Sequence, residues 1–404
     1  MRPSLRLLSA LLPPLAFTSL VAAPLTATAQ TQAQARAPIS AEAYRQDALA
    51  LLALIEAKYA YLERLPDGRF PISPELIAQA EAVHDAPSLL RYAEHALTVL
   101  ADHHAITGSS LADSWAVVPS YADLWIEQVE GRWTITDVRD GSPAAAAGVR
   151  SGDRLLALDN QSVDDAISLF WSKVGLAPEG ERAAFAARVL ASGRRDRPRN
   201  LMIESADGVQ RRLTLPNLYT TQRDHPPVHS RQAGDALEIR INDALGDQAT
   251  IAAFDNAMAT ARPGQTIILD LTETPGGGNT VVARAIMGWF VEAPAAYQIH
   301  TLPAETRETG IERRWIEQVS PRPGKHHDGP VIVRVGRWTG SMGEGLAIGL
   351  DAQGAQVVGR PMAGLLGAIY DLRLPNSGLV VKIPVERLYA VDGTPREQFR
   401  PRPD

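Results

Sequence analysis

The sequence predicts a multidomain α/β protein, because three kinds of pattern follow one another along its 404 residues. Apolar residues recur at helical spacing in the first part, short strand patterns dominate the middle, and strands alternate with helices in the last part. With 45% hydrophobic and 21% charged residues, each part can bury a core of its own. The length suggests two or three domains.

The composition argues against several classes of function. A net charge of −6 gives no electrostatic footprint for nucleic acid, so we expect no nucleic-acid partner. A chain without cysteine cannot use a thiolate nucleophile, a zinc–thiolate site or an iron–sulfur cluster. His326 and His327 are adjacent but lack a third ligand, and we expect neither a metal nor an organic cofactor.

Residues 1–29 have the order of regions found in a secretory signal peptide. Arg2 and Arg6 precede a mainly apolar run, Leu7–Leu25, and Ala27–Ala29 has the small-residue pattern of a cleavage site. Three prolines interrupt the apolar run, which argues against a permanent transmembrane helix. We expect a periplasmic or secreted mature protein without a stable membrane anchor.

The segment 30–114 is expected to form a helical N-terminal domain. Apolar residues recur at helical spacing from a cap candidate, Ser40, to about residue 65. A second helical stretch runs from Pro74 to about residue 100, with a division at Pro87. The domain contains an Asp-His-His sequence at 102–104.

The segment 115–216 is expected to be rich in strands, and 217–234 to be a linker with adjacent prolines. The expected strands are 133–138 and 154–158, with a hairpin near 207–208, and the expected helices are 163–175 and 181–192.

The segment 235–404 alternates strands with helices, which predicts a central sheet flanked by helices. The expected strands are 237–241, 266–271 and 331–335, and the expected helices are 247–261, 279–291 and 342–351. In such a layer, ligands bind at the carboxyl ends of the strands.

Two of those strand ends carry unusual turns. Gly276, Gly277 and Gly278 follow one strand and free backbone N–H groups to face an anion. Ser341, flanked by glycines, follows another strand at the start of a helix. Each turn alone has a simpler explanation, a tight turn or a helix N-cap. As a pair in one sheet, they could supply a hydroxyl and an oxyanion pocket.

These turns resemble two motifs of the tail-specific, or C-terminal processing, peptidases of family S41. Leu269–Gly277 is similar to the D-x-R-x-N-x-G-G segment, with Thr272 and Thr274 in place of the arginine and asparagine. Thr339–Glu344 is similar to the T-x-S-x-x-E nucleophile motif, with Ser341 as the serine. The resemblance covers most of 235–404 and implies an S41 protease-like domain.

The resemblance implies a serine endopeptidase that acts on polypeptides. Ser341 would be the nucleophile, and the N–H groups of Met342 and of Gly276 or Gly277 would form the oxyanion hole. The two replaced residues, Thr272 and Thr274, also leave an alternative, a catalytically inactive relative that serves as a peptide-binding or scaffold protein.

The middle domain carries a further resemblance. Gly141–Asp159 is similar to the S-P-A-x-x-A-G signature and following G-D of PDZ domains in exported proteases. A PDZ-like domain binds an extended peptide by adding it to a sheet edge. The carboxylate-binding loop would lie near 120–124, where Asp123 is unfavourable for an anionic terminus.

The general base depends on the branch of the family. One branch uses a Ser-Lys dyad, and here Leu365 stands at the position of the lysine. Lys382, in an apolar strand, would be the remaining lysine candidate. The tricorn-like branch uses serine, histidine and glutamate, with the histidine in an L-x-D-x-H segment before the PDZ-like domain. Leu100–His104 is similar to that segment, which makes His104 the implied base.

The third residue of that branch is a glutamate near the C-terminus. Arg396–Asp404 is similar to its glutamate-containing ending, which implies that Glu397 orients His104, with Glu386 as the second choice.

Overall fold

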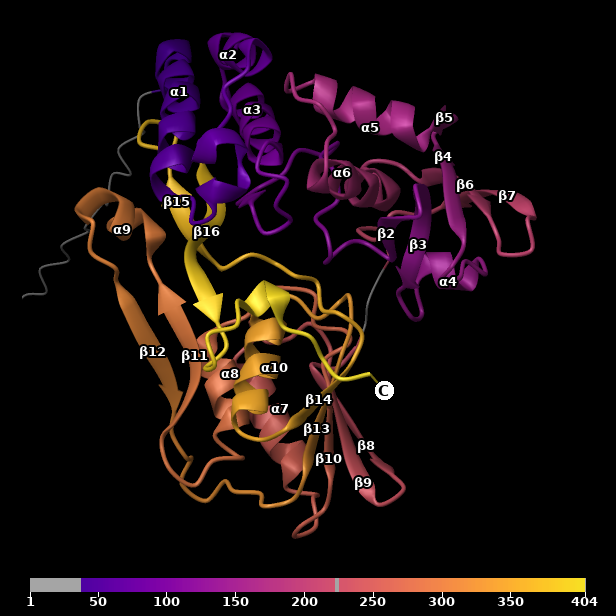
Figure 1. Ribbon diagram of the computed structural model, residues 1–404, viewed down its shortest axis with the longest axis vertical. Helices are drawn as coiled ribbons and strands as arrows, with labels where there is room; N and C mark the ends of the chain where they lie inside the picture. The colour runs from indigo at the N-terminus through magenta and orange to yellow at the C-terminus, as the bar shows by residue number, and fades with distance from the viewer. Residues whose placement is uncertain (1–37, 222–224, 404) are drawn as a thin grey trace, which may run out of the picture. The chain divides into compact units, whose positions relative to one another are not determined.

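Three β-sheets and their flanking helices make up the part of the chain that the computed structural model describes, residues 38–221 and 225–403 (Figure 1). The fold is mixed α/β, which confirms the predicted fold class. The segment predicted as a signal peptide, 1–29, lies outside the described residues. Within them, no helix combines the length and the apolar character needed to cross a membrane.

The first unit contains the helices α1 (Ala41–Lys58), α2 (Pro74–Glu81) and α3 (Ala86–Thr98). Each begins at a side-chain cap, because Ser40, Ser73 and Asp85 accept a hydrogen bond from a backbone N–H of the first turn. Helix α1 ends earlier than the sequence predicts, since Tyr59 is extended. Two short 3-10 turns follow, Leu62–Arg64 and Pro66–Gly68.

The middle sheet is antiparallel, with the strand order β2-β3-β4-β6-β7 and β5 paired to β4. Its elements are β2 (Leu124–Val129), β3 (Arg132–Val138), α4 (Pro143–Ala146), β4 (Arg154–Leu158), β5 (Gln161–Ser162), α5 (Val163–Ser172), α6 (Glu181–Ser192), β6 (Arg199–Glu204) and β7 (Gln210–Leu215). Strand β2 lies at the edge of this sheet, next to α6. An edge strand beside a helix is where a PDZ-like domain would add a peptide.

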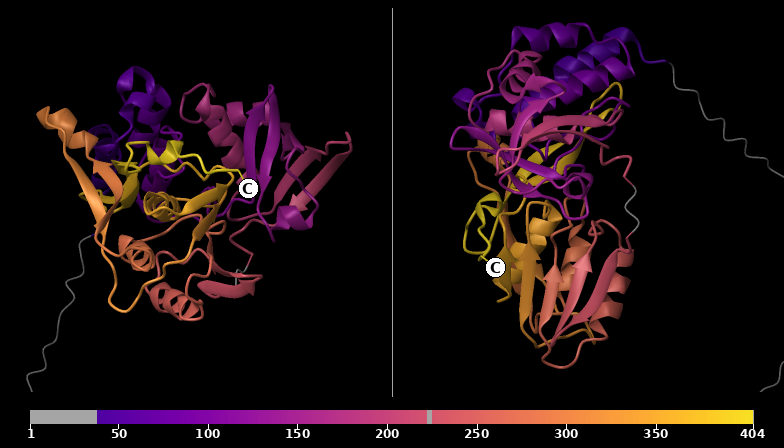
Figure 2. Two further views of the ribbon diagram at one scale, coloured as in Figure 1. Left: turned by 60° about the horizontal axis from the view of Figure 1, so that its bottom comes forward. Right: turned by 90° about the vertical axis from the view of Figure 1, so that its right-hand side faces the viewer.

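The last part of the chain contains a mostly parallel sheet with the order β14-β13-β10-β9-β8, which can be followed in the right-hand view of Figure 2. Its elements are β8 (Val228–Ala233), β9 (Ala236–Ile241), α7 (Ala249–Met258), β10 (Ile267–Asp270), α8 (Thr280–Met287), β13 (Val331–Val335), α10 (Met342–Ala352) and β14 (Gln356–Gly359). Strand β8 is antiparallel and lies inside the segment predicted as a linker, so the sheet starts earlier than expected. Because β10 and β13 are parallel neighbours, the two unusual turns leave the sheet side by side.

A further sheet was not predicted from the sequence. It has the order β1-β16-β11-β12, with β15 also paired to β16. Its elements are β1 (Ile106–Thr107), β11 (Ala295–Thr301), α9 (Pro303–Thr309), β12 (Arg314–Val319), β15 (Ala368–Arg373) and β16 (Val380–Tyr389), and the 3-10 turn Arg396–Gln398 follows. Strand β1 comes directly after the Asp-His-His sequence and pairs Ile106 with Lys382. This pairing brings the end of the helical unit to the C-terminal part of the chain.

Candidate active site

The two turns pack directly against each other. Thr274 and Thr339 form a parallel bridge, and Gly340 N–H donates to Thr274 O at 2.9 Å. A Cβ atom on Gly340 would lie 2.5 Å from Pro275 O, and one on Gly343 would lie 2.7 Å from Thr274 Oγ1. Only glycine allows this approach, which explains why glycines flank Ser341.

Ser341 itself has a backbone conformation that residues other than glycine rarely adopt. Its φ is 52° and its ψ is −115°, immediately before α10 begins at Met342. Such a residue costs on the order of 1–3 kcal/mol, and it persists only where its surroundings hold it. Here Ser341 N–H donates to Glu344 Oε2 at 2.9 Å, and Glu344 is completely buried.

His104 lies within hydrogen-bond distance of this serine. Its Nε2 is 3.0 Å from Ser341 Oγ, although the two residues are far apart in the sequence. The backbone N–H of His104 donates to Asp102 Oδ1 at 2.8 Å, and Tyr59 OH donates to Asp102 Oδ2 at 2.9 Å. The buried side chain of Asp102 therefore connects the histidine segment to the end of α1.

The other ring nitrogen of His104 contacts a backbone carbonyl. Nδ1 is 2.6 Å from Leu366 O, and a carbonyl can only accept a hydrogen bond. The proton is therefore assigned to Nδ1, which leaves Nε2 as an acceptor for the Ser341 hydroxyl. A hydroxyl beside an accepting, oriented imidazole has the geometry of an activated nucleophile.

Two sequence models match this chain. Residues 236–404 match peptidase family S41, and residues 134–170 match the PDZ domain. Residues 236–404 therefore form a peptidase domain of family S41. The chain is a serine-type peptidase that carries a PDZ domain, and these two features indicate a polypeptide substrate.

Solved structures share the fold of this S41 peptidase. The structure of mature CPAF is 15% identical, with a TM-score of 0.57, over 90% of this chain and 92% of that chain. The photosystem II D1 C-terminal processing protease is 17% identical, with a TM-score of 0.55, over 87% of this chain and 90% of that chain. No curated protein sequence matches the chain.

Of the two predicted glutamates, Glu386 binds other side chains, whereas Glu397 lines the same cavity as Asp102 and Leu366. Glu386 accepts from His300 Nδ1–H at 2.7 Å and also contacts Tyr370 OH. In the described residues, Glu397 makes no hydrogen bond to His104, and its buried Oε2 has no hydrogen-bond partner. The position next to Nδ1 belongs to the Leu366 carbonyl instead. A backbone carbonyl carries no signal in the sequence, which is why sequence reasoning missed it.

The predicted oxyanion donors differ in whether their backbone N–H groups already have a hydrogen-bond acceptor. Met342 is the first residue of α10, where a backbone N–H has no acceptor within the helix. Gly278 packs on Met342, since a Cβ atom on Gly278 would lie 2.2 Å from Met342 Cβ. Gly276 N–H already donates to Asp243 Oδ1, at 3.3 Å. Gly276 is therefore the less suitable of the two predicted glycine donors, because its N–H already has an acceptor.

Neither lysine position of the Ser-Lys branch serves this site. Leu365 is buried, and its Cδ1 would lie 3.1 Å from a Cβ atom on Gly340. Lys382 is on β16, where its Nζ donates to Asp371 Oδ1 at 2.8 Å. Among the described residues, His104 is thus the only side-chain base that contacts the Ser341 hydroxyl.

Burial controls the protonation of the site. Desolvation, assisted by the nearby Arg396 guanidinium, lowers the pKa of His104 to about 4, so the imidazole is neutral at physiological pH. Burial raises the pKa of Asp102 to about 6 and that of Glu344 to about 7. A neutral histidine is the form that can accept the serine proton.

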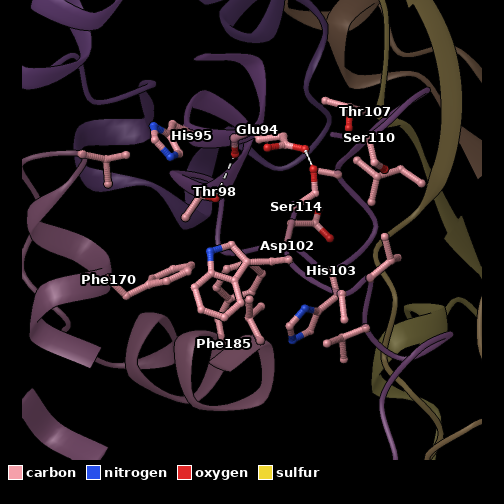
Figure 3. Close-up of a pocket in the computed structure, with 18 of the residues that line it drawn as sticks. Glu94, His95, Thr98, Asp102, His103, Thr107, Ser110, Ser114, Phe170 and Phe185 are labelled. Atoms are coloured by element: carbon pink, nitrogen blue, oxygen red, sulfur yellow. Dashed lines mark hydrogen bonds between the residues drawn. The ribbon is translucent and has the colours of Figure 1, made fainter. Parts of the chain in front are cut away.

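A small pocket of about 120 Å³ is lined in part by Asp102 and His103 (Figure 3). Phe170 and Phe185 form its apolar side, and Glu94 and Ser114, which are hydrogen-bonded to each other, form its polar side. Ser341 and His104 are not among the residues that line it. This pocket therefore borders the segment that holds His104 but includes neither the nucleophile nor the base.

Proposed function

We propose that this S41 peptidase is an exported serine endopeptidase in which Ser341 is the nucleophile and His104 is the general base. The observation that supports the proposal is the 3.0 Å distance between Ser341 Oγ and His104 Nε2, with Nδ1 held by the Leu366 carbonyl. Both the hydrogen-bond reach and the tautomer suit proton transfer from the serine.

The reaction would follow the acyl-enzyme route. Ser341 Oγ attacks the scissile carbonyl while its proton passes to His104 Nε2, and the N–H of Met342 supports the oxyanion. His104 then returns the proton to the leaving amine as the C–N bond breaks. A water molecule hydrolyses the ester in the second half, with His104 again taking and returning a proton.

The edge strand β2 is our candidate for substrate capture. Its C-terminal half, Glu127–Val129, lines a cavity of about 990 Å³ that also includes Ala184 of α6 and Leu365 and Leu366 from the active-site loop. A peptide that extends this sheet would therefore run toward the loop that orients His104. Arg188 of α6 donates to the Ile126 carbonyl of this edge, at 3.4 Å.

The PDZ domain also contacts the catalytic turns directly. Arg139 Nε donates to Glu273 Oε2 at 2.8 Å, next to the glycine turn. Trp338, just before the serine turn, donates from Nε1 to Ala122 O at 2.7 Å. These contacts support a single substrate path that is shared by the PDZ domain and the peptidase domain.

Export is the remaining part of the proposal, and it rests on the sequence of residues 1–29. Expression of the full chain in a Gram-negative host should give a periplasmic protein with Gln30 as its N-terminus. Fractionation followed by N-terminal sequencing tests this. A cytoplasmic product that retains Arg2 and Arg6 would contradict it.

The catalytic part is tested by a fluorophosphonate probe on the mature chain, residues 30–404. We expect covalent labelling at Ser341, identified by mass spectrometry, and loss of labelling in Ser341→Ala. If the folded protein binds a peptide but shows neither labelling nor hydrolysis, the chain is an inactive peptide-binding or scaffold relative.

A further inference from the structure

The carbonyl that orients His104 comes from a loop without regular secondary structure. This loop, Ala363–Gly367, is called the orienting loop below; it lies between β14 and β15 and presents Leu366 O to His104 Nδ1. A loop carbonyl can orient a catalytic base only if its position is fixed within a few tenths of an ångström. Two buried ionisable side chains, Glu344 and Arg396, provide that restraint.

The first side chain, Glu344, connects the orienting loop to the nucleophile. Its Oε1 accepts from Gly364 N–H at 2.8 Å, and its Oε2 accepts from Leu365 N–H at 3.3 Å. The same Oε2 accepts from Ser341 N–H at 2.9 Å. One carboxylate thus holds both the serine backbone and the start of the loop.

The second side chain, Arg396, holds the loop on both sides of the orienting carbonyl. Its Nη2 donates to Leu365 O and to Gly367 O, each at 2.8 Å, and these residues flank Leu366. Arg396 is only 2% exposed, and Nη2 lies 3.8 Å from Glu344 Oε2. A charged residue in so buried a place is held by its partners, and here these are the orienting loop and Glu344.

We propose that Arg396 and Glu344 are a pair of positioning residues that fix the orienting loop and so align His104 with Ser341. This inference rests on the proposed function. Neither side chain touches substrate. Each acts through the backbone, one on the N–H groups and the other on the carbonyls of the same loop.

The charged groups around His104 allow the proposal to be tested by the pH dependence of kcat. A purely structural role of Arg396 would not change that pH dependence. Arg396 faces the imidazole through the orienting loop, and Asp102 holds its backbone N–H. Because the guanidinium lowers the pKa of His104, Arg396→Gln should raise that pKa. The acid limb of kcat against pH should then move to higher pH.

The experiment compares Arg396→Gln, Arg396→Lys and Glu344→Gln in the mature chain. We expect kcat to fall about a hundredfold in Arg396→Gln, since a displacement of about 1 Å at a reacting group has this effect, with KM within about threefold. Arg396→Lys should recover part of kcat, because one ammonium group can reach one of the two carbonyls. The double variant should lose little more than the more damaging single variant.

Arg322→Gln is the matched control. Arg322 donates to both oxygens of Asp255, at 2.7 and 2.8 Å, and to Ala285 O at 2.9 Å, away from the orienting loop. This variant should lose stability but keep the kcat and the acid limb of the wild type. If Arg396→Gln does not fold, Arg396→Lys carries the test by its kcat alone, because lysine keeps the positive charge and should leave the acid limb in place.

Wild-type kcat and an unmoved acid limb in folded Arg396→Gln would overturn the proposal, as would wild-type kcat in Arg396→Lys. An equal loss of kcat in Arg322→Gln would also overturn it, because the effect would then follow general stability. If the proposed function itself is wrong, the result is distinguishable, because the wild type would then not be labelled at Ser341 by the fluorophosphonate probe.

Discussion

The nucleophile and the base of this site are held in opposite ways. Ser341 is positioned locally, by the turn between β13 and α10 and by Glu344, which is three residues further along the chain. His104 follows no helix or strand directly, and it is held by Leu366, Asp102 and the pairing of β1 with β16. The nucleophile is thus a property of one motif, whereas the base exists only in the complete fold.

The largest effect is expected at the locally positioned residue. Ser341→Ala should abolish peptide hydrolysis, with a loss of about three orders of magnitude or more in kcat. Its melting temperature should stay within a few degrees of the wild type, because the Ser341 contact with Glu344 uses the backbone N–H. A steady-state assay and thermal unfolding measure both. Turnover at the wild-type rate would disprove the assignment.

The next largest effect separates the histidine from the lysine. His104→Ala should cost several orders of magnitude in kcat, since no other side-chain base contacts the Ser341 hydroxyl in the described residues. Lys382→Ala should keep wild-type kcat, because the Lys382 ammonium group is hydrogen-bonded to Asp371 in the described residues and not to Ser341. The opposite result would assign the enzyme to the Ser-Lys mechanism.

A smaller effect tests the long-range support of His104. Asp102→Ala removes the acceptor for the His104 backbone N–H and should lower kcat about tenfold, the equivalent of one lost hydrogen bond. Tyr59→Phe removes only the second contact of Asp102 and should have a weaker effect. If Tyr59→Phe lowers kcat more than Asp102→Ala does, Asp102 is not the residue that positions the His104 backbone.

The smallest effect is a change in stability with pH. Burial raises the pKa of Glu344 to about 7, above the value of about 4.3 in an unfolded chain. Between these values the folded protein binds a proton that the unfolded chain does not, so the contribution of Glu344 to stability falls as the pH rises. The free energy of unfolding of the wild type, minus that of Glu344→Gln, should therefore decrease from pH 5 to pH 8. Urea unfolding at both pH values measures this, and a constant or growing difference would contradict it.

The same contrast explains which parts of the structure could be predicted. Strand β13, α10 and the turn at Ser341 follow from local patterns, because glycines and a strand-to-helix boundary leave clear signals. The segment around His104 was found through a family resemblance, and the structure places it beside Ser341. The catalytic roles of both residues stay predictions until they are tested.

The remaining features depend on contacts between distant parts of the chain. Strand β1 has only two residues, Ile106 and Thr107, which is too short for a periodic pattern. The Leu366 carbonyl could not be predicted, because every residue has one. The sequence pointed to Glu397 as the orienting residue, whereas the adjacent Arg396 holds the orienting loop.

The most direct test of the central claim is the rate of fluorophosphonate labelling at Ser341 as a function of pH, in the wild type and in His104→Ala. Because burial lowers the pKa of His104 to about 4, the wild-type labelling rate should fall only well below pH 6.5, with a midpoint of about 4. His104→Ala should label far more slowly across the whole range. Equally fast labelling of His104→Ala would show that Ser341 does not depend on His104 and would contradict the account.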